Sequence, residues 1–178
     1  MPVPTIQSIL FILISILIGY LSRDSLRLRH SHSLTRFLAL ESILALTVLS
    51  IPVWMVNPLS YLQILSWTLL LSALILAVHG YRLLILVGKP EMKLEGNNQL
   101  AVEGFYKYIR HPLYTSLILF SMGVFLKAAT LANTVLLLSG MVFLYLTARD
   151  EEMENLDRFG VEYAEYLDTS KMFVPFVF

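Results

Sequence analysis

The sequence contains no cysteine among its 178 residues. That absence excludes disulfide bonds, thiolate metal ligands and a cysteine nucleophile. Charged residues are also scarce, at 15% of the chain, whereas soluble domains carry about 25%. Basic and acidic residues number 13 each, so the net charge is zero and no basic surface indicates nucleic-acid binding. Hydrophobic residues make up 57% and gather in long runs, which predicts an all-α integral membrane protein.

Three runs in the first half of the chain are long enough to cross a bilayer, which takes ~20 apolar residues. They extend from Val3 to Leu21, from Leu34 to Val56 and from Tyr61 to Val87. Basic residues follow the first run rather than precede it, and no small-residue cleavage site comes after it. This pattern is typical of a retained span and not of a signal peptide.

The second half of the chain is apolar from Leu113 to Ala148, with an interruption at Lys127-Ala-Ala-Thr130. This pattern predicts a helical hairpin. Its first arm, Leu113 to Leu126, is only ~21 Å long at about 1.5 Å per residue. The arm therefore crosses a locally thinned bilayer, starts earlier in the sequence, or re-enters the membrane. We favour two crossings in the hairpin, which gives about five transmembrane helices.

Basic residues are distributed unevenly around these runs. Twelve of the 13 Lys and Arg residues fall on one side, and Lys127 falls on the other. The positive-inside rule predicts that the crowded side is cytoplasmic, so the N-terminus is expected outside and the C-terminus inside. Four spans with a re-entrant hairpin would give the same distribution. The two polar segments, Lys89 to Pro112 and Arg149 to Ser170, are both cytoplasmic in this arrangement, and any chemistry is expected there.

The first polar segment ends in a cluster of functional side chains. The eleven residues from Gly104 to Tyr114 include three tyrosines, an arginine and a histidine. Pro112 suits the first turn of a helix, where its missing N–H would be unpaired anyway. Arg110 and His111 would then lie at a helix N-terminus, which favours an anionic or polar ligand group. An aromatic belt with interfacial basic residues explains these residues, taken alone, equally well.

The second polar segment begins with four charges, Arg149-Asp150-Glu151-Glu152, directly after the last run. Charges at a membrane interface are costly unless they are paired or used. A solvated helix extension is the simpler interpretation of this segment taken alone. Gly160 then predicts a helix stop, followed by a short amphipathic stretch.

Taken together, the two segments resemble the isoprenylcysteine carboxyl methyltransferase-like family of membrane methyltransferases, which includes phospholipid N-methyltransferases. The family pattern is Gly-x-Tyr, Arg-His-Pro-x-Tyr, a helical hairpin, Glu-Glu, and Phe-Gly-x-x-Tyr-x-x-Tyr with a later proline. The residues that match it in order and spacing are Gly104, Tyr106, Arg110-His111-Pro112-Leu113-Tyr114, Glu151-Glu152, Phe159-Gly160, Tyr163, Tyr166 and Pro175. The match covers about Gly80 to Pro175.

The resemblance implies a pocket for S-adenosyl-L-methionine, built by the two polar segments over the hairpin. A carboxylate suits the ammonium or sulfonium group of this cofactor, and aromatic rings suit its adenine and its positive charge. The cofactor-binding residues that the family pattern implies are Asn98, Gln99, Leu100, Ala101, Tyr106, His111, Pro112, Leu113, Tyr114 and Glu151.

The sequence departs from the prenylcysteine enzymes of that family at one position. Those enzymes have an arginine four residues before the first glutamate of the pair, where it holds the substrate carboxylate. This chain has Thr147 at that position, and its arginine is Arg149. The two positions point in different directions on a helix, which counts against a prenylcysteine carboxylate as the acceptor.

We expect methyl transfer to a lipophilic acceptor, such as an isoprenylcysteine carboxylate or a phospholipid amine, that enters from the bilayer. The candidate catalytic residues are Arg110, Arg149 and Glu152. A carboxylate acceptor would need only an orienting cation such as Arg110 or Arg149. An amine or thiol would have to lose a proton, for which His111 or Glu152 could serve as the base.

Two other functions are compatible with parts of the pattern. NADPH-dependent sterol or enone reductases of membranes have a similar Arg-His-Pro-x-Tyr hairpin but are usually longer. A non-enzymatic adaptor of the same fold would not need His111, Tyr114 and Glu151 intact. Membrane lipids and a lipophilic substrate are the expected partners, without nucleic acid. The chain is interpreted as one domain, 1–178, with three spans in 1–87 and the catalytic half in 88–178.

The other histidines carry weaker signals. His30 and His32 flank the first basic loop and are expected at the membrane interface. His79 lies inside the third run, where a buried histidine bonded to a neighbouring carbonyl is favoured over a functional role. No group of residues has metal-ligand spacing, so no metal site is predicted.

Overall fold

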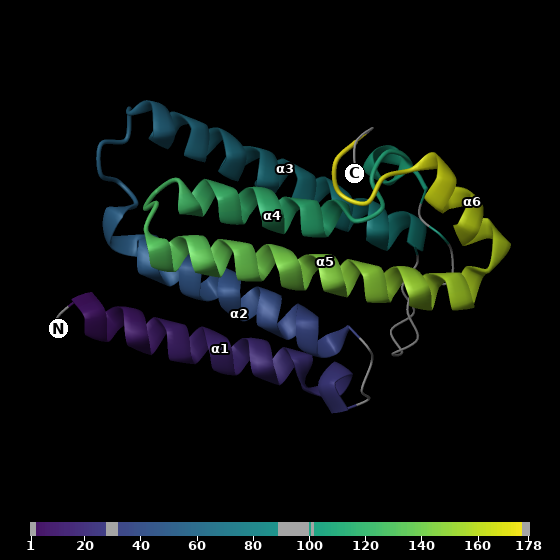
Figure 1. Cartoon of the computed structure of the whole chain (residues 1–178), viewed down its shortest axis with the longest axis horizontal. Coiled ribbons are helices and arrows are strands. Elements are labelled where there is room, and N and C mark those ends of the chain that lie inside the picture. The colour runs from purple at the N-terminus through teal and green to yellow at the C-terminus, as the bar shows by residue number, and fades with distance from the viewer. Residues whose placement is uncertain (1–2, 28–31, 89–99, 101, 176–178) are drawn as a thin grey trace.

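The computed structural model describes residues 3–27, 32–88, 100 and 102–175. The regular elements in these residues are helices: α1 (Val3–Arg27), α2 (Ser33–Ser50), the 3₁₀ helix η1 (Ile51–Val53), α3 (Tyr61–Gly88), the 3₁₀ helix η2 (Gly104–Lys107), α4 (Pro112–Phe125), α5 (Leu131–Phe159) and α6 (Val161–Thr169). Helices α1 to α5 run along the long axis of the molecule, and α6 turns away at the end of α5 (Figure 1).

The prediction of an all-helical chain is confirmed in the described residues, and four of their helices are long and apolar enough to cross a membrane. These candidate spans are Thr5–Arg23, Ser33–Val53, Tyr61–Leu86 and Leu131–Phe159. The predicted span from Leu113 to Leu126 forms α4, which has 14 residues and is shorter than the other four. Five complete crossings therefore stay a prediction.

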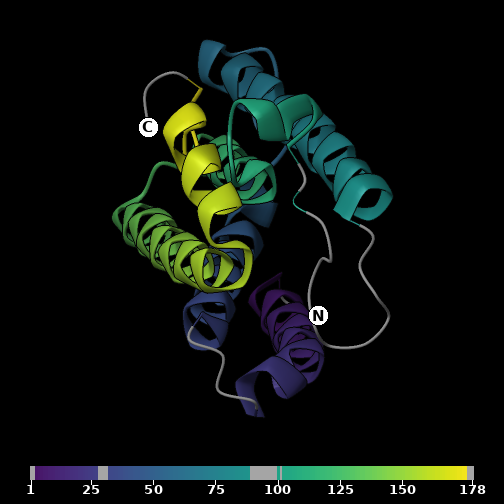
Figure 2. The same ribbon diagram turned by 90° about the vertical axis from the view of Figure 1, so that its right-hand side faces the viewer.

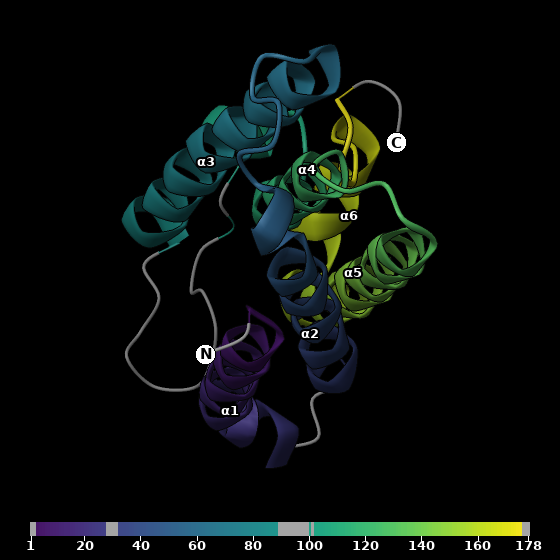
Figure 3. The same cartoon turned by 90° about the vertical axis from the view of Figure 1, so that its left-hand side faces the viewer.

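The centre of the bundle lies where α2, α4 and α5 meet. Ala39, Ile43 and Leu144 are buried there, and Tyr114 and Phe143 pack against them. Viewed from one end, α4 lies between α3 and α5, while α1 lies beside α2 at the edge (Figure 3). The outer surface of α1 is apolar and exposed, as expected for a helix surrounded by lipid.

Local sequence signals set the ends of the two hairpin helices. Pro112 occupies the first turn of α4, where no N–H is required. The Thr130 side chain accepts a hydrogen bond from the Asn133 N–H at 3.2 Å and caps α5. Gly160, at φ 57°, ends α5 and begins α6. The left-handed conformation that glycine tolerates lets the chain turn there, so that α6 lies beside η2 (Figure 2).

The residues after α6 return to the segment before α4. The N–H groups of Arg110 and His111 donate to the carbonyls of Lys171 and Met172, at 2.7 and 3.2 Å, and the Lys171 N–H donates to Tyr108 at 3.0 Å. The buried side chains of Met172 and Phe173 then pack against Ala148 and neighbouring residues of α4 and α5. This short pairing holds the chain around residue 111 in place, and no residue pattern in the sequence indicated it.

Candidate functional site

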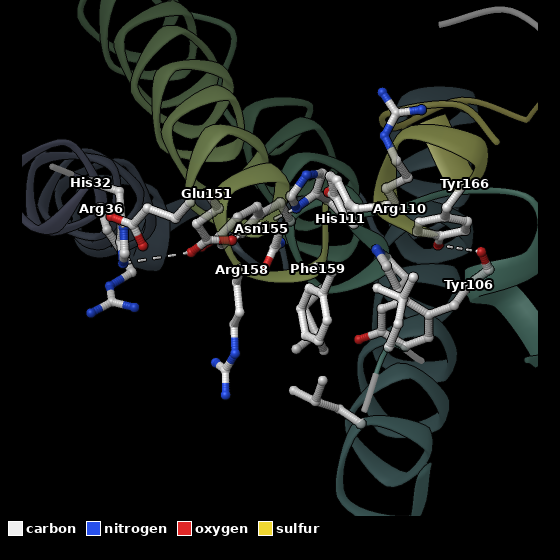
Figure 4. A pocket seen from close by; sticks show the side chains of 17 residues that line it. His32, Arg36, Tyr106, Arg110, His111, Glu151, Asn155, Arg158, Phe159 and Tyr166 are labelled. Carbon is white, nitrogen blue, oxygen red and sulfur yellow. Dashed lines mark hydrogen bonds and ion pairs between the residues drawn. The ribbon is translucent and has the colours of Figure 1, made fainter. Parts of the chain in front are cut away.

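A cavity of about 580 Å³ lies at the end of the bundle where α2 begins, α4 begins and α5 ends. Side chains from α2 to α6 and η2 contribute to its wall (Figure 4). The lining residues are His32, Arg36, Leu84, Leu100, Tyr106, Arg110, His111, Pro112, Leu113, Tyr114, Glu151, Glu154, Asn155, Arg158, Phe159, Tyr163 and Tyr166. Both polar segments of the sequence therefore contribute to one cavity.

His111 lies in this wall at the start of α4. Its ring stacks on Tyr114, with centroids 5.5 Å apart and an angle of 14° between the planes. Its Nδ1 lies 3.8 Å from Glu151 Oε2, and its Nε2 lies 3.3 Å from Glu152 Oε1. The residue is only 7% exposed, and among the described residues its Nε2 has no hydrogen bond of good geometry. The nearest acceptor of Nε2 is therefore Glu152 Oε1, which also accepts a hydrogen bond from Arg110.

Glu151 occupies the middle of the cavity wall. The Tyr114 hydroxyl donates a hydrogen bond to its Oε1, and His111 lies beside its other oxygen. On the opposite side, His32 Nε2 lies 3.9 Å from Oε1 (Figure 4). The Glu151 side chain keeps 25% of its surface exposed. The carboxylate is thus oriented by the protein and still accessible to a cationic ligand group.

Arg110 and Glu152 form an ion pair behind this wall. Arg110 Nε donates to Glu152 Oε1 at 2.6 Å, and one terminal nitrogen donates to the carbonyl of Ser170 at 2.6 Å. Their side chains are only 10% and 13% exposed. The pair connects the start of α4 to the C-terminal part of α5, and the Ser170 carbonyl adds the end of α6. The guanidinium is therefore bound mainly to the protein, so its geometry favours a positioning role over holding an acceptor carboxylate.

Three tyrosines form the wall on the side of η2 and α6. The Tyr166 hydroxyl donates to the Tyr106 carbonyl, and the rings of Tyr163 and Tyr166 meet edge to face at 5.8 Å. Burial, and secondarily the charge of Glu151, raises the pKa of Tyr106 to about 12. Burial likewise raises the pKa of Tyr163 to about 12. These hydroxyls stay neutral near pH 7 and can act as hydrogen-bond donors.

Gly104 positions η2 against α3. Its φ is +57°, and an added Cβ would lie 2.5 Å from Leu83 Cδ1. Glycine is required here by conformation and by space. The neighbouring Phe105 packs edge to face on His79, with centroids 5.1 Å apart. The expectation of a buried His79 is wrong, because its side chain is exposed on α3.

The structure brings most of the predicted site residues together. Leu100, Tyr106, Arg110, His111, Pro112, Leu113, Tyr114 and Glu151 line the cavity. Glu152 does not line it but contacts two residues that do. Arg149 is exposed and lies outside the lining. Asn98, Gln99 and Ala101 lie outside the described residues.

Several lining residues were not predicted from the sequence. Glu154, Asn155, Arg158 and Phe159 follow Glu151 at helical spacing on α5, and this periodicity could have indicated them. His32 and Arg36 come from the start of α2. They share a helix face by their four-residue spacing, but nothing in the sequence connects that face to α5.

A model of the family described as "Protein of unknown function (DUF1295)" matches residues 22–169. The match includes α2 to α6 and every residue that lines the cavity. No curated protein matches the chain.

Proposed function

The chain belongs to the DUF1295 family, and we propose that its cavity binds S-adenosylmethionine and transfers the methyl group to a lipophilic acceptor. The observation that carries the proposal is the Glu151 carboxylate, which Tyr114 and His111 orient in the wall of the cavity and whose side chain stays 25% exposed. These residues belong to the motif that resembles the membrane methyltransferases.

The cavity residues fit this cofactor chemically. The volume of about 580 Å³ is within the ~300–1,000 Å³ of small-molecule sites. Glu151 would offset the positive charge of an ammonium or sulfonium group, and His111 Nε2 would bond a polar group of the ligand. The rings of Tyr106, Phe159 and Tyr163 offer apolar surface to an adenine or a cation.

The bound cofactor would supply a methyl group already activated on sulfur, so the protein mainly has to orient the reactants. Glu151 would fix the position of the positive charge, with Tyr114 and His111 holding its carboxylate. The ion pair of Arg110 and Glu152 would keep the segment around His111 rigid. The aromatic wall would exclude water and strengthen these electrostatic interactions.

A second candidate function is NADPH-dependent reduction of a membrane substrate. Arg36 and Arg158 line the cavity, and guanidinium groups suit the phosphates of a dinucleotide.

Isothermal titration of the detergent-solubilised protein with S-adenosylmethionine and with NADPH separates the two functions. We expect binding of S-adenosylmethionine, weakened about tenfold to a hundredfold by Glu151→Gln through loss of a charge-assisted contact. Arg149→Ala is the matched control, because Arg149 lies outside the lining. Binding of NADPH without S-adenosylmethionine would overturn the proposal.

We further propose that the cavity faces the cytoplasm, as the distribution of basic residues predicts. The chain has no cysteine, so single cysteines can report the side of the membrane. Ser60 and Asp168 are exposed and lie at opposite ends of the bundle. In intact cells an impermeant thiol reagent should label Ser60→Cys and leave Asp168→Cys unlabelled. The reverse labelling would invert the orientation.

A further inference from the structure

His32 and Glu154 form a hydrogen-bonded pair in the cavity wall. His32 Nδ1 lies 3.1 Å from Glu154 Oε1. The histidine immediately precedes α2, and its carbonyl accepts hydrogen bonds from the Thr35 hydroxyl and the Arg36 N–H, both at 3.0 Å. Its side chain is 12% exposed, against 42% for Glu154. The backbone and the carboxylate together fix the ring in the wall, while the carboxylate itself reaches solvent.

This contact determines which nitrogen of His32 can take a proton. A carboxylate accepts from Nδ1–H, so the neutral ring carries its hydrogen on Nδ1 and Nε2 is the basic atom. Nε2 lies 3.9 Å from Glu151 Oε1 and belongs to the same cavity. A base whose second nitrogen is oriented by a carboxylate is the arrangement used for general-base catalysis.

The two histidines of the cavity lie on opposite sides of Glu151 (Figure 4). His111, between Glu151 and Glu152, belongs to the part of the wall assigned above to the cofactor. His32 faces the same carboxylate from α2, which leaves it on the side available to an acceptor.

We infer that His32 is the general base of this site, oriented by Glu154, and that the acceptor is a lipophilic amine, thiol or hydroxyl compound. The inference rests on the proposed methyl transfer. The acceptor atom forms a bond to the methyl carbon while the carbon–sulfur bond breaks, and sulfur keeps the electron pair. The proton of the acceptor passes to His32 Nε2 and then to water at the exposed Glu154. A carboxylate acceptor has no proton to lose and would leave this pair without a role.

The surroundings suit a histidine that becomes charged during the reaction. Glu151 and Glu154 face its ring from α5, at 3.9 and 3.1 Å. Arg36, one turn further along α2, opposes that charge from the same wall, and the Tyr114 hydroxyl of α4 is bound to Glu151. A positive charge that develops on the ring during proton transfer would therefore lie between two carboxylates.

The first experiment uses NMR of ¹⁵N-histidine-labelled full-length protein in detergent micelles, which reports the tautomer of each ring. The chain has four histidines, and His32→Gln identifies the signal. We expect the Nδ1–H form of His32 in the wild type and its loss in Glu154→Leu, whereas Asp157→Asn on the exposed face of α5 leaves it unchanged. An Nε2–H form that does not respond to Glu154→Leu would overturn the pair. This measurement needs no cofactor, so it stands apart from the test of methyl transfer.

The second experiment compares dodecanethiol, dodecylamine and dodecanoate as methyl acceptors with labelled S-adenosylmethionine. We expect methylation of the thiol or the amine, and a fall of about 10²–10⁴ in kcat for His32→Gln with unchanged affinity for S-adenosylmethionine. With dodecanethiol the deficit should shrink at alkaline pH, where the thiolate forms without a base. A deficit constant with pH, or methylation of dodecanoate alone, would overturn the role of His32. Absence of S-adenosylmethionine binding by the wild type would instead overturn the proposed function.

Discussion

The two ends of the helical bundle both bury a basic side chain, but they do so in different ways. At the end where α4 turns into α5, Lys127 is 6% exposed, donates to Gln63 Oε1 at 2.8 Å and lies 3.5 Å from the centroid of the Trp67 ring. At the other end, Arg110 is bound by Glu152 and by backbone carbonyls. The cavity of about 580 Å³ described above lies at this second end, with His111 in its wall.

The comparison separates polar residues that hold segments of the protein together from polar residues that line the cavity. Arg110 and Lys127 each have their donors directed at groups of the protein, so both act as connections between segments. His111, Glu151 and His32 instead line the cavity, and the Glu151 side chain is 25% exposed. A basic residue near a site is therefore not by itself a ligand-binding group. Its partners decide its role, and the variants below test this distinction from the largest expected effect to the smallest.

The largest effect is expected from breaking the ion pair of Arg110 and Glu152. Glu152→Leu leaves a nearly buried guanidinium without its carboxylate, which typically costs about 3–5 kcal/mol. Arg149→Ala removes an exposed arginine on the same helix and should change stability by no more than about 0.5 kcal/mol. Thermal melting of both variants in the same detergent measures the difference. Equal melting temperatures would show that the pair is not a structural connection.

A smaller effect, confined to ligand binding, is expected for His111→Ala. The variant should bind S-adenosylmethionine about tenfold to a hundredfold more weakly, because a buried hydrogen-bonding group contributes about 1.5–3 kcal/mol when its partner is charged. Methyl transfer should be lost, while thermal melting should show a folded protein, since the bundle packs elsewhere. His79→Ala, on the exposed surface of α3, serves as the control. Unchanged affinity and turnover would remove His111 from the site.

A change at Lys127, at the end of the bundle opposite the cavity, should alter stability alone. Lys127→Met removes the hydrogen bond to Gln63 and the cation–π contact with Trp67, at a cost of about 1–3 kcal/mol. S-adenosylmethionine affinity should stay within about twofold, because the cavity lies at the far end of α3 and α4. A melt and a binding titration of the same preparation check both statements. A large loss of affinity would show that the two ends are coupled.

Much of this arrangement could be predicted from the sequence because it depends on local signals. The apolar runs from Val3 and from Tyr61 became α1 and α3, and Pro112 and Gly160 begin and end helices where their backbone preferences predict. The resemblance to the membrane methyltransferases implied that Tyr106, His111, Tyr114 and Glu151 meet, and all four line the cavity.

What the sequence did not reveal depends on contacts between distant segments. The pairing of Lys171 with residues 108 and 110 uses backbone hydrogen bonds, which leave no residue pattern. His32 reaches Glu154 across 122 positions of the chain. The guanidinium of Arg110 has the chemistry of a ligand-binding group, and only the positions of Glu152 and the Ser170 carbonyl show that the protein occupies it.

The smallest expected effect concerns the ionisation of the Tyr106 hydroxyl in the cavity wall. Tyrosine in an unfolded chain has a pKa of about 10, and burial followed by the charge of Glu151 raises the pKa of Tyr106 to about 12. Between these values the unfolded state has lost the proton and the folded state has kept it. The unfolded state therefore binds fewer protons, so the free energy of unfolding falls as the pH rises from about 10 to 12 and is unaffected below that window.

The expected behaviour of Tyr106→Phe follows from this fall in the free energy of unfolding. Tyr106→Phe cannot ionise, so its melting temperature should fall less steeply than that of the wild type between pH 10 and 12, with an upper limit of about 2–3 kcal/mol for the whole difference. Tyr61→Phe, at a residue 93% exposed, makes the same chemical change at the opposite end of the bundle and should follow the wild-type curve. Melting curves of the three proteins across this pH range are the measurement. Parallel curves for Tyr106→Phe and the wild type would mean that the Tyr106 hydroxyl ionises as readily in the cavity wall as in the unfolded chain.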